Sequence, residues 1–409
     1  MTIVTVPGAN GATLSLNYDN NANAMLARDI AGAIRAGLNN HTIVAADSAN
    51  GPPPVLPAGK TGEWVQSTSN TTILPSGYDN VVNTANGAVI FGSGGPNEHI
   101  LSGDRALKFF ATGGSGTIVT GAGNNFISIP ASDNGAWTID TGGGNDTIRA
   151  AGGGNDTISA GAGKNSIFLG DGNNTIFTTG ADTIIAGAGS ETIVARGEHA
   201  SDVVFGNGSK LFFVAEGGAT VFGGTGSDTV YGDDGPDLMF GGSAGNNLLI
   251  AGGGKATLFG GGNGDRLFAA GDEAQALHAA GGTETLFGGA ASGNDTFYGG
   301  SGSDQITGGS GKNTFVAGTG SATIAASPGG ENVFEFVKGA AGGTELVIDL
   351  TKASQVHIDL DGYGEKEIKQ ALAGQTHAGG GVTITLSDHT SITFQNISAL
   401  TRSNFGGVG

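Results

Sequence analysis

Aspartate recurs at one place in a repeated, glycine-rich step of this sequence, a pattern that suits cation binding. In "GGTGSDTVYGDDGPDLMFGG", residues 223–242, Asp228 and Asp237 take the sixth place of two consecutive nine-residue steps. Glycine is costly inside strands and helices and is selected where a turn needs positive φ or where backbones crowd together. A glycine turn also leaves its carbonyl oxygens unshielded, and carbonyls with a carboxylate are the hard ligands that calcium prefers.

The elements that would hold these aspartates are short strands joined by glycine turns. From about residue 87 to residue 336 the sequence repeats at a period of roughly nine residues. In "TGGGNDTIRAAGGGNDTISAGAGKNSIFLGDGNNTIF" one position is taken by Ile148, Ile158, Ile167 and Ile176. Because so short a strand cannot bury its one apolar side chain alone, steps must stack, two to a coil, around a thin core. The sequence predicts an all-β fold, a parallel β-roll or β-solenoid.

With two steps to a coil, the sixth residues sort into two columns, one on each side. The first column reads Asp146, Asn165, Asp182, Asp202, Ala219, Asp237, Ala256, Gln275, Asp295 and Asn313. The second reads Asp156, Asn174, Glu191, Lys210, Asp228, Asn247, Asp265, Glu284, Asp304 and Ala322. Neutral residues interrupt both columns and Lys210 would repel an ion, so we expect metal in only some turns. The best candidate is the second column from Asp228 to Asp304, where every side chain carries oxygen.

The rest of the chain divides into an N-terminal segment, a spacer and a cap. In residues 1–50 a short amphipathic helix is predicted, because apolar residues recur near the helical period at Met25, Leu26, Ile30, Ala33, Ile34 and Leu38. Residues 51–86 begin with the proline-rich "GPPPVLPAGKTG" and are interpreted as a spacer leading into the solenoid. Residues 87–338 are the predicted β-roll. Residues 339–409 show alternating strand patterns and are predicted to form a β cap over the last coil.

Composition excludes several classes of partner. Asp and Glu number 36 against 17 Lys and Arg, and the formal charge of −19 argues against nucleic acid and favours cations. The absence of cysteine rules out disulfides and thiolate metal sites. No stretch is long and apolar enough to span a bilayer, and the N-terminus lacks the pattern of a Sec-type signal peptide. We therefore expect any export to use a route that does not read the N-terminus.

Each step approximates G-G-x-G-x-D-x-U-x, where U is a large apolar residue. "GGTGSDTVY" (223–231) and "GGSGSDQIT" (299–307) match it in full. This tandem array resembles the calcium-binding nonapeptides of the repeats-in-toxin (RTX) family, and "SDHTSITFQNISALTRSNF" resembles the end of its type I secreted members. The resemblance implies Ca²⁺ between the turns of adjacent coils and transport by type I secretion machinery. The implied ligands are Asp146, Asp156, Asp182, Asp202, Asp228, Asp237, Asp265, Asp295 and Asp304, with Gly224, Gly226, Gly300 and Gly302 in the two full matches.

A simpler alternative needs no metal. Aspartate and asparagine are good turn residues in their own right, and stacked asparagine amides can hydrogen-bond along a ladder. On this interpretation the sixth position would serve the turns alone.

A second regularity is expected on the outside of the coils. The residue after U points away from the core and is often large and apolar: Phe168, Phe177, Phe205, Phe213, Phe222, Tyr231, Phe240, Ile250, Phe259, Phe268, Phe287 and Tyr298. These side chains either pack on one another or under the N-terminal segment, or they form a self-association surface.

Three functions follow, in order of preference. The first is a secreted, calcium-stiffened structural protein that assembles with itself into an extracellular surface layer, filament or biofilm matrix. The second is an adhesin that presents threonines to a cell-surface glycan, a matrix or ice, through Thr147, Thr157, Thr175, Thr183 and Thr192. The third, a toxin or hydrolase, lacks support: no HExxH motif and no complete phosphate loop occur, and the seven histidines are scattered, so we expect no enzyme.

Overall fold

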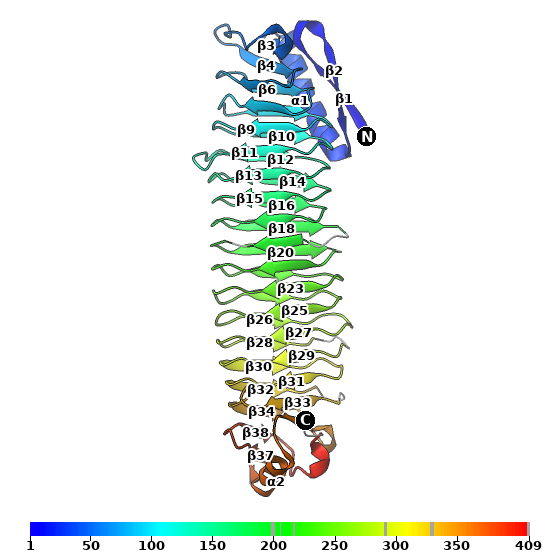
Figure 1. Cartoon of the computed structure of the whole chain (residues 1–409), viewed down its shortest axis with the longest axis vertical. Coiled ribbons are helices and arrows are strands. Elements are labelled where there is room, and N and C mark those ends of the chain that lie inside the picture. The colour runs from blue at the N-terminus through cyan, green and yellow to red at the C-terminus, as the bar shows by residue number, and fades with distance from the viewer. Residues whose placement is uncertain (198–200, 205, 216, 290–292, 328–330, 407–409) are drawn as a thin grey trace. The chain divides into compact units, whose positions relative to one another are not determined.

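A computed structural model describes residues 1–197, 201–204, 206–215, 217–289, 293–327 and 331–406, without the side chains of 201, 202, 204 and 213–215. The chain forms two compact units, Met1–Leu211 and Phe212–Gly409. Each unit is built mainly from short strands stacked in parallel (Figure 1). The predicted all-β parallel solenoid is therefore confirmed.

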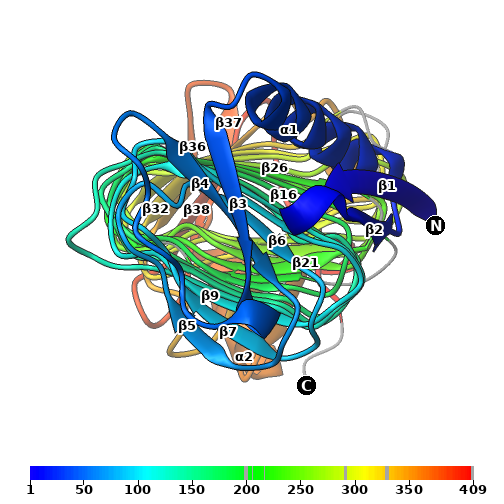
Figure 2. The same ribbon diagram turned by 90° about the horizontal axis from the view of Figure 1, so that it is seen from above.

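In the first unit the strands belong to two parallel sheets on opposite sides of the core (Figure 2). One sheet contains β3 (Ile43–Asp47), β4 (Thr61–Gln66), β6 (Asn80–Asn83), β8 (Glu98–Ser102), β10 (Gly116–Thr120), β12 (Trp137–Asp140), β14 (Thr157–Gly161), β16 (Thr175–Thr178) and β18 (Glu191–Arg196). The other contains β5 (Thr71–Ile73), β7 (Ala88–Phe91), β9 (Leu107–Phe110), β11 (Phe126–Ile129), β13 (Thr147–Ala150), β15 (Ser166–Leu169), β17 (Thr183–Ile185) and β19 (Ser201–Val204). The division between the units falls within β20 (Lys210–Ala215).

The register of these sheets confirms two nine-residue steps per coil. Ile158 of β14 is paired with Ile139 of β12 and with Ile176 of β16. On the other sheet Ile148 is paired with Ile167. All five side chains are fully buried, so the U position supplies a continuous apolar column to each face of the core.

A hairpin and a helix lie against the first coils of this unit. β1 (Thr2–Pro7) and β2 (Thr13–Tyr18) pair antiparallel, and α1 (Asn21–Asn39) follows them. The side chain of Asn20 caps the helix by accepting the N–H of Asn23 at 2.8 Å. The buried face of α1 packs in one cluster with the outward side chains Val82, Leu101 and Val119. In these coils the N-terminal segment thus covers the outward apolar residues Val82, Leu101 and Val119, which precede the predicted row from Phe168 to Tyr298.

The helix is present, but its buried face differs in part from the predicted one. Ile30 and Ile34 are buried as expected, whereas Met25 is 63% exposed and Ala33 is also exposed. Half of the buried residues of the helix are alanines, namely Ala24, Ala27 and Ala31. Small side chains allow the helix to approach the sheet closely, and they carry little weight in a hydrophobic pattern. The prediction was therefore wrong for Met25 and Ala33.

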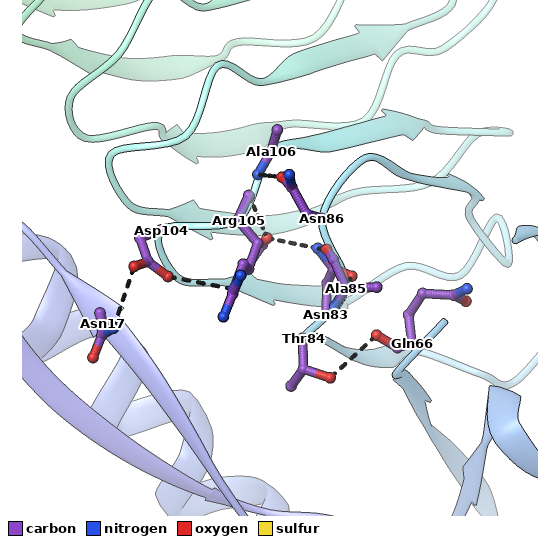
Figure 3. A network of polar contacts seen from close by, with 10 residues as sticks. Asn17, Gln66, Asn83, Thr84, Ala85, Asn86, Asp104, Arg105 and Ala106 are labelled. Carbon is purple, nitrogen blue, oxygen red and sulfur yellow. Dashed lines mark hydrogen bonds and ion pairs between the residues drawn. The ribbon is translucent and has the colours of Figure 1, made fainter. Parts of the chain in front are cut away.

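Polar contacts join the hairpin to a coil and join the first coils to one another (Figure 3). The Asn17 amide of β2 donates to the Asp104 carboxylate at 3.2 Å, and the same carboxylate lies 3.7 Å from the Arg105 guanidinium. One turn earlier in the stack, Asn86 accepts the N–H of Ala106 at 3.1 Å. A Cβ atom on residue 103 would lie only 2.7 Å from the backbone N and O atoms of Asn17. Glycine at this position therefore permits the close approach of the hairpin.

The parallel stack begins earlier than the expected boundary at residue 87. β3 pairs with β4, and β4 with β6, in the same parallel sense as the later strands. These first coils lack the glycine–aspartate step, so the pattern that marks the later coils does not reveal them.

The second unit continues the same construction and ends in a small cap. One sheet contains β22 (Thr229–Tyr231), β24 (Leu248–Ile250), β26 (Arg266–Phe268), β28 (Thr285–Phe287), β30 (Ser303–Thr307), β32 (Ser321–Ala325), β34 (Thr344–Ile348) and β38 (Ser391–Phe394). The other contains β21 (Ala219–Phe222), β23 (Asp237–Phe240), β25 (Ala256–Phe259), β27 (Ala276–His278), β29 (Thr296–Tyr298), β31 (Thr314–Val316), β33 (Val333–Val337) and β35 (His357–Asp361).

The cap of the second unit changes strand direction. β36 (Thr376–Ala378) pairs antiparallel with β37 (Gly381–Thr385), and β37 with β38. The helix α2 (Glu365–Ala373) precedes these strands, and short 3₁₀ turns occur at Ala9–Gly11, Ser48–Asn50, Ala353–Gln355 and Arg402–Asn404. Across the residues that the structure describes, neither helix combines the length and the apolar character needed to cross a bilayer.

Candidate metal-binding turns

The sixth residue of each step lies where a glycine turn meets the following strand, and its side chain points inward. In a strand, side chains two residues apart share a face, so Asp146 lies beside buried Ile148 and Asp156 beside buried Ile158. The aspartates Asp146, Asp156, Asp182, Asp228, Asp237, Asp265, Asp295 and Asp304 are all at least 95% buried. The side chain of Asp202 lies outside the described residues.

Hydrogen bonds link these residues into the two columns expected from the sequence. In the first unit Asp146 Oδ1 accepts the N–H of Asn125 at 2.7 Å, and Asn165 Oδ1 accepts the N–H of Asp146 at 2.9 Å. In the second unit Asn247 Oδ1 accepts the N–H of Asp228, and Asp265 Oδ1 that of Asn247, each at 2.8 Å. One oxygen of each side chain thus takes the place of a backbone carbonyl between coils, which aspartate and asparagine can do equally well.

The second carboxylate oxygen distinguishes aspartate from asparagine. Oδ2 of Asp146, Asp182 and Asp295 is buried and has no hydrogen-bond partner in the described part of the chain. In other turns Oδ2 faces glycine N–H groups: Asp265 accepts those of Gly261 and Gly262 at 2.7 and 3.0 Å. Buried polar groups are nearly always satisfied in folded proteins, so the unpartnered oxygens are suited to be ligands of a cation.

Burial also raises the pKa of these carboxyl groups. Desolvation raises the pKa of Asp146 to about 7 and that of Asp156 to about 6. It likewise raises the pKa of Asp237 to about 6, and Asp233 nearby adds to the rise. For Glu284, desolvation and then Asp304 raise the pKa to about 7. Near neutral pH a bound proton or a nearby cation would therefore stabilise these groups in the folded state.

The turns of adjacent coils bring backbone carbonyls close to these side chains. A Cβ on Gly300 would lie 1.7 Å from the Ala280 oxygen, and one on Gly302 would lie 1.5 Å from the Gly282 oxygen. The Gly224 N–H lies 3.4 Å from Asp228 Oδ2, and Gly226 lies in the same turn. Glycine is required here because the backbones almost touch.

Gln275 shows how tightly the turn carbonyls converge. Its Nε2 donates to the oxygens of Gly252, Gly254 and Ala270 at 2.8, 2.7 and 2.6 Å. Three carbonyls therefore surround one atom at a sixth position. Within the described ranges no three His, Cys, Asp or Glu side chains gather in a way that could hold a metal. A metal in these turns would accordingly take most of its ligands from carbonyls and one or two from carboxylates, which calcium accepts.

Several buried acids outside the predicted columns escaped the sequence analysis. Desolvation raises the pKa of both Glu63 and Glu345 to about 8, and Asp304 contributes at Glu345. Glu345 precedes the buried Val347 by two residues, the same inward offset as the sixth position. That offset could have identified it, whereas Glu63 belongs to the coils without the repeat.

A family of known proteins matches several segments of the chain. The family described as RTX calcium-binding nonapeptide repeat (4 copies) matches residues 110–128, 140–176, 178–199, 215–244 and 290–324. No curated protein and no solved structure matches the chain. The matched segments contain Asp146, Asp156, Asp182, Asp228, Asp237, Asp295 and Asp304. These segments of the chain therefore match the RTX calcium-binding nonapeptide repeat.

Proposed function

We propose that this chain is a secreted, calcium-binding structural protein that assembles with itself into an extracellular layer, filament or matrix. Calcium binding follows from the repeats, which are those of a calcium-binding family. The nine predicted aspartates are the proposed ligands, together with the turn carbonyls around them. The observation that carries self-assembly is an uncovered aromatic row on the second unit.

This aromatic strip consists of Phe222, Phe240, Phe259, His278 and Tyr298, one from each of β21, β23, β25, β27 and β29. Neighbouring ring centroids are 5.1, 4.8, 4.4 and 4.0 Å apart, and every neighbouring pair is stacked. Phe222 remains 43% exposed and the other four are half-buried. The rings therefore pack on one another, which was one of the two expectations, and the row is still partly exposed to solvent.

In the first unit, outward apolar residues on consecutive strands are covered by a helix of the same chain. There α1 packs on the outward residues Val82, Leu101 and Val119. The aromatic strip has no comparable cover among the described residues, and contiguous exposed apolar surface commonly marks an interaction site. A second copy of the chain presents the same flat strip, so strip-to-strip contact would bury both.

We expect the triple variant Phe222→Thr, Phe240→Thr and Phe259→Thr to remain monomeric in calcium while the unaltered chain assembles. Burial of one phenylalanine side chain contributes roughly 1.5 to 3 kcal/mol, so loss of three removes most of the attraction. Light scattering measures assembly, and circular dichroism below the melting temperature verifies the fold. The matched control replaces Thr157, Thr175 and Thr192 with serine and should still assemble; assembly of the phenylalanine variant would exclude the strip.

A second candidate function, adhesion, is favoured by one observation. Thr117, Thr138, Thr157, Thr175 and Thr192 are in register on consecutive strands of one sheet. All five are at least partly exposed, so they form a row of hydroxyl and methyl groups that could contact a glycan, a matrix or ice. Threonine also suits strands for conformational reasons alone. Loss of surface binding in the threonine-to-serine control, with assembly unchanged, would favour adhesion.

Secretion is proposed through the C-terminal segment, which resembles that of type I secreted proteins. We expect a chain lacking residues 350–409 to remain inside a host that carries the cognate type I exporter. The segment includes the cap strands β36 to β38, which lie apart from the repeats in sequence. Immunoblotting of medium and cells measures the distribution, and normal export of the truncated chain would contradict this part of the proposal.

A further inference from the structure

Lys210 is a fully buried lysine at a sixth position of the repeat. Its side chain and that of Glu191 both have 0% exposure, and the two form an ion pair. Lysine is almost never fully buried unless it is paired. Lys210 follows Glu191 in the same column, so this pair occupies the place where two successive turns meet.

The ammonium of Lys210 is held by the kind of ligands that a cation needs. Nζ donates to the carbonyl oxygen of Gly189, which lies in the turn before Glu191. It also donates, at 3.2 Å, to the carbonyl oxygen of Asn207 in the turn before Lys210 itself. Glu191 Oε2 supplies the negative charge. The other oxygen of Glu191 lies 3.4 Å from the Asn174 amide. Two turn carbonyls and one carboxylate from adjacent turns thus converge on one positive charge.

Other sixth positions show that this arrangement is specific to the residue present. At Gln275 the side-chain amide donates to three turn carbonyls. At Asp146, Asp182 and Asp295 the side chain brings no donor, and its second oxygen is left unpartnered within the described residues. The turn carbonyls therefore receive a donor from the chain where the sixth residue carries N–H groups, whereas at Asp146, Asp182 and Asp295 the sixth residue offers only oxygen.

We propose that the Lys210 ammonium is a built-in cation, which occupies the position between the Glu191 and Lys210 turns that a calcium ion takes between aspartate turns. These coils are consequently held together without metal, and a divalent cation enters there only when the lysine is replaced. The entry of a divalent cation after replacement of the lysine rests on the proposed calcium binding by the aspartate turns. The metal-free link between these two coils does not.

The test compares the full chain with Lys210→Met and Lys210→Asp. In chelator, hydrogen exchange of the β18 amides should be on the order of 100-fold faster in Lys210→Met, because removal of one partner leaves a buried charge uncompensated. Lys164→Met is the matched control, since Lys164 is exposed at a fifth position of the same unit, and it should leave this rate unchanged. Lys210→Asp should bind one more Ca²⁺ than the unaltered chain by calorimetric titration, and its β18 protection should become calcium-dependent.

Each arm has an outcome that would overturn the proposal. Exchange in Lys210→Met at the rate of the unaltered chain would show that the ammonium does not hold these turns. Equal calcium stoichiometry in Lys210→Asp would show that the position is not a cation site. If Lys210→Met does not fold, Glu191→Gln added to it should restore folding by removing the uncompensated carboxylate; failure of that rescue would point to lost packing instead. Absence of calcium binding by the unaltered chain would contradict the proposed function. The hydrogen-exchange comparison of Lys210→Met in chelator would still decide whether the ammonium holds these turns.

Discussion

In chelator at pH 8 we expect the protein to melt at a much lower temperature than in millimolar calcium, and we expect acidification to pH 5 to recover part of the loss. The reason is the set of buried carboxyl groups whose pKa is raised by desolvation. The pKa is about 7 for Asp146 and Glu284 and about 6 for Asp156 and Asp237. A raised pKa stabilises the folded state while the proton is bound, and that stability is lost as the pH rises through the folded-state pKa.

The expected effect is large because several groups act together. Each unit of pKa difference corresponds to about 1.4 kcal/mol, and a typical domain has a net stability of only about 5 to 15 kcal/mol. The pH window follows from the values: the loss begins above the ordinary carboxyl pKa near 4 and is complete above about pH 8 for these groups. Calcium favours the deprotonated form, so it should stabilise most at the high end of this window.

Thermal denaturation followed by circular dichroism measures both effects. Magnesium at the same concentration is the control, because it demands a smaller, near-octahedral site and should raise the melting temperature less. Equal melting temperatures in chelator and in calcium at pH 8 would contradict the prediction. So would a chelated protein that becomes less stable between pH 8 and pH 5.

A single methyl group on Gly302 should disrupt the stacking of its turn. The Cβ of Gly302→Ala would lie 1.5 Å from the Gly282 oxygen and 2.5 Å from its carbonyl carbon. These are backbone atoms of the neighbouring turn, so they cannot move aside without separating the coils. We expect a loss of roughly 1 to 3 kcal/mol or more in the free energy of unfolding, together with weaker calcium binding by that turn.

Gly342→Ala is the matched control in the same unit. Nothing lies within 4 Å of a Cβ at Gly342, and its φ is not in the left-handed region. Such a substitution changes stability by at most about 1 kcal/mol, generally upward, because it restricts the unfolded chain. Urea denaturation of both variants in calcium measures the contrast, and similar midpoints for the two would show that close approach of the turns is not what requires glycine at Gly302.

The coil architecture could be predicted because the same nine-residue pattern recurs many times along the sequence. One large apolar residue per step, at the position of Ile148 and Ile158, fixes the core, and the spacing of the sixth residues gives both columns. The nine-residue pattern did not reveal the first coils, from β3 to β6, because they use other residues for the same purpose. At α1 the pattern favoured Met25, whereas packing against Val82 and Leu101 selects the smaller alanines.

The candidate site was predictable in composition and not in detail. Sequence identifies where an aspartate lies in the step, but the partner of its second oxygen depends on the neighbouring turn. This is why Asp265 is satisfied by glycine N–H groups while Asp146 is not. Lys210 illustrates the same limit: its charge predicts that an ion is repelled, and only the structure shows the carbonyls of Gly189 and Asn207 around the ammonium.

Calcium titration of the full chain at pH 7, by calorimetry in two buffers of different ionisation enthalpy, tests the central claim most directly. If buried carboxyl groups such as Asp146 hold protons near neutral pH and exchange them for calcium, several ions should bind and protons should be released. The observed heat would then differ between the two buffers by an amount that gives the number of protons. Absence of binding, or binding with the same heat in both buffers, would contradict the account.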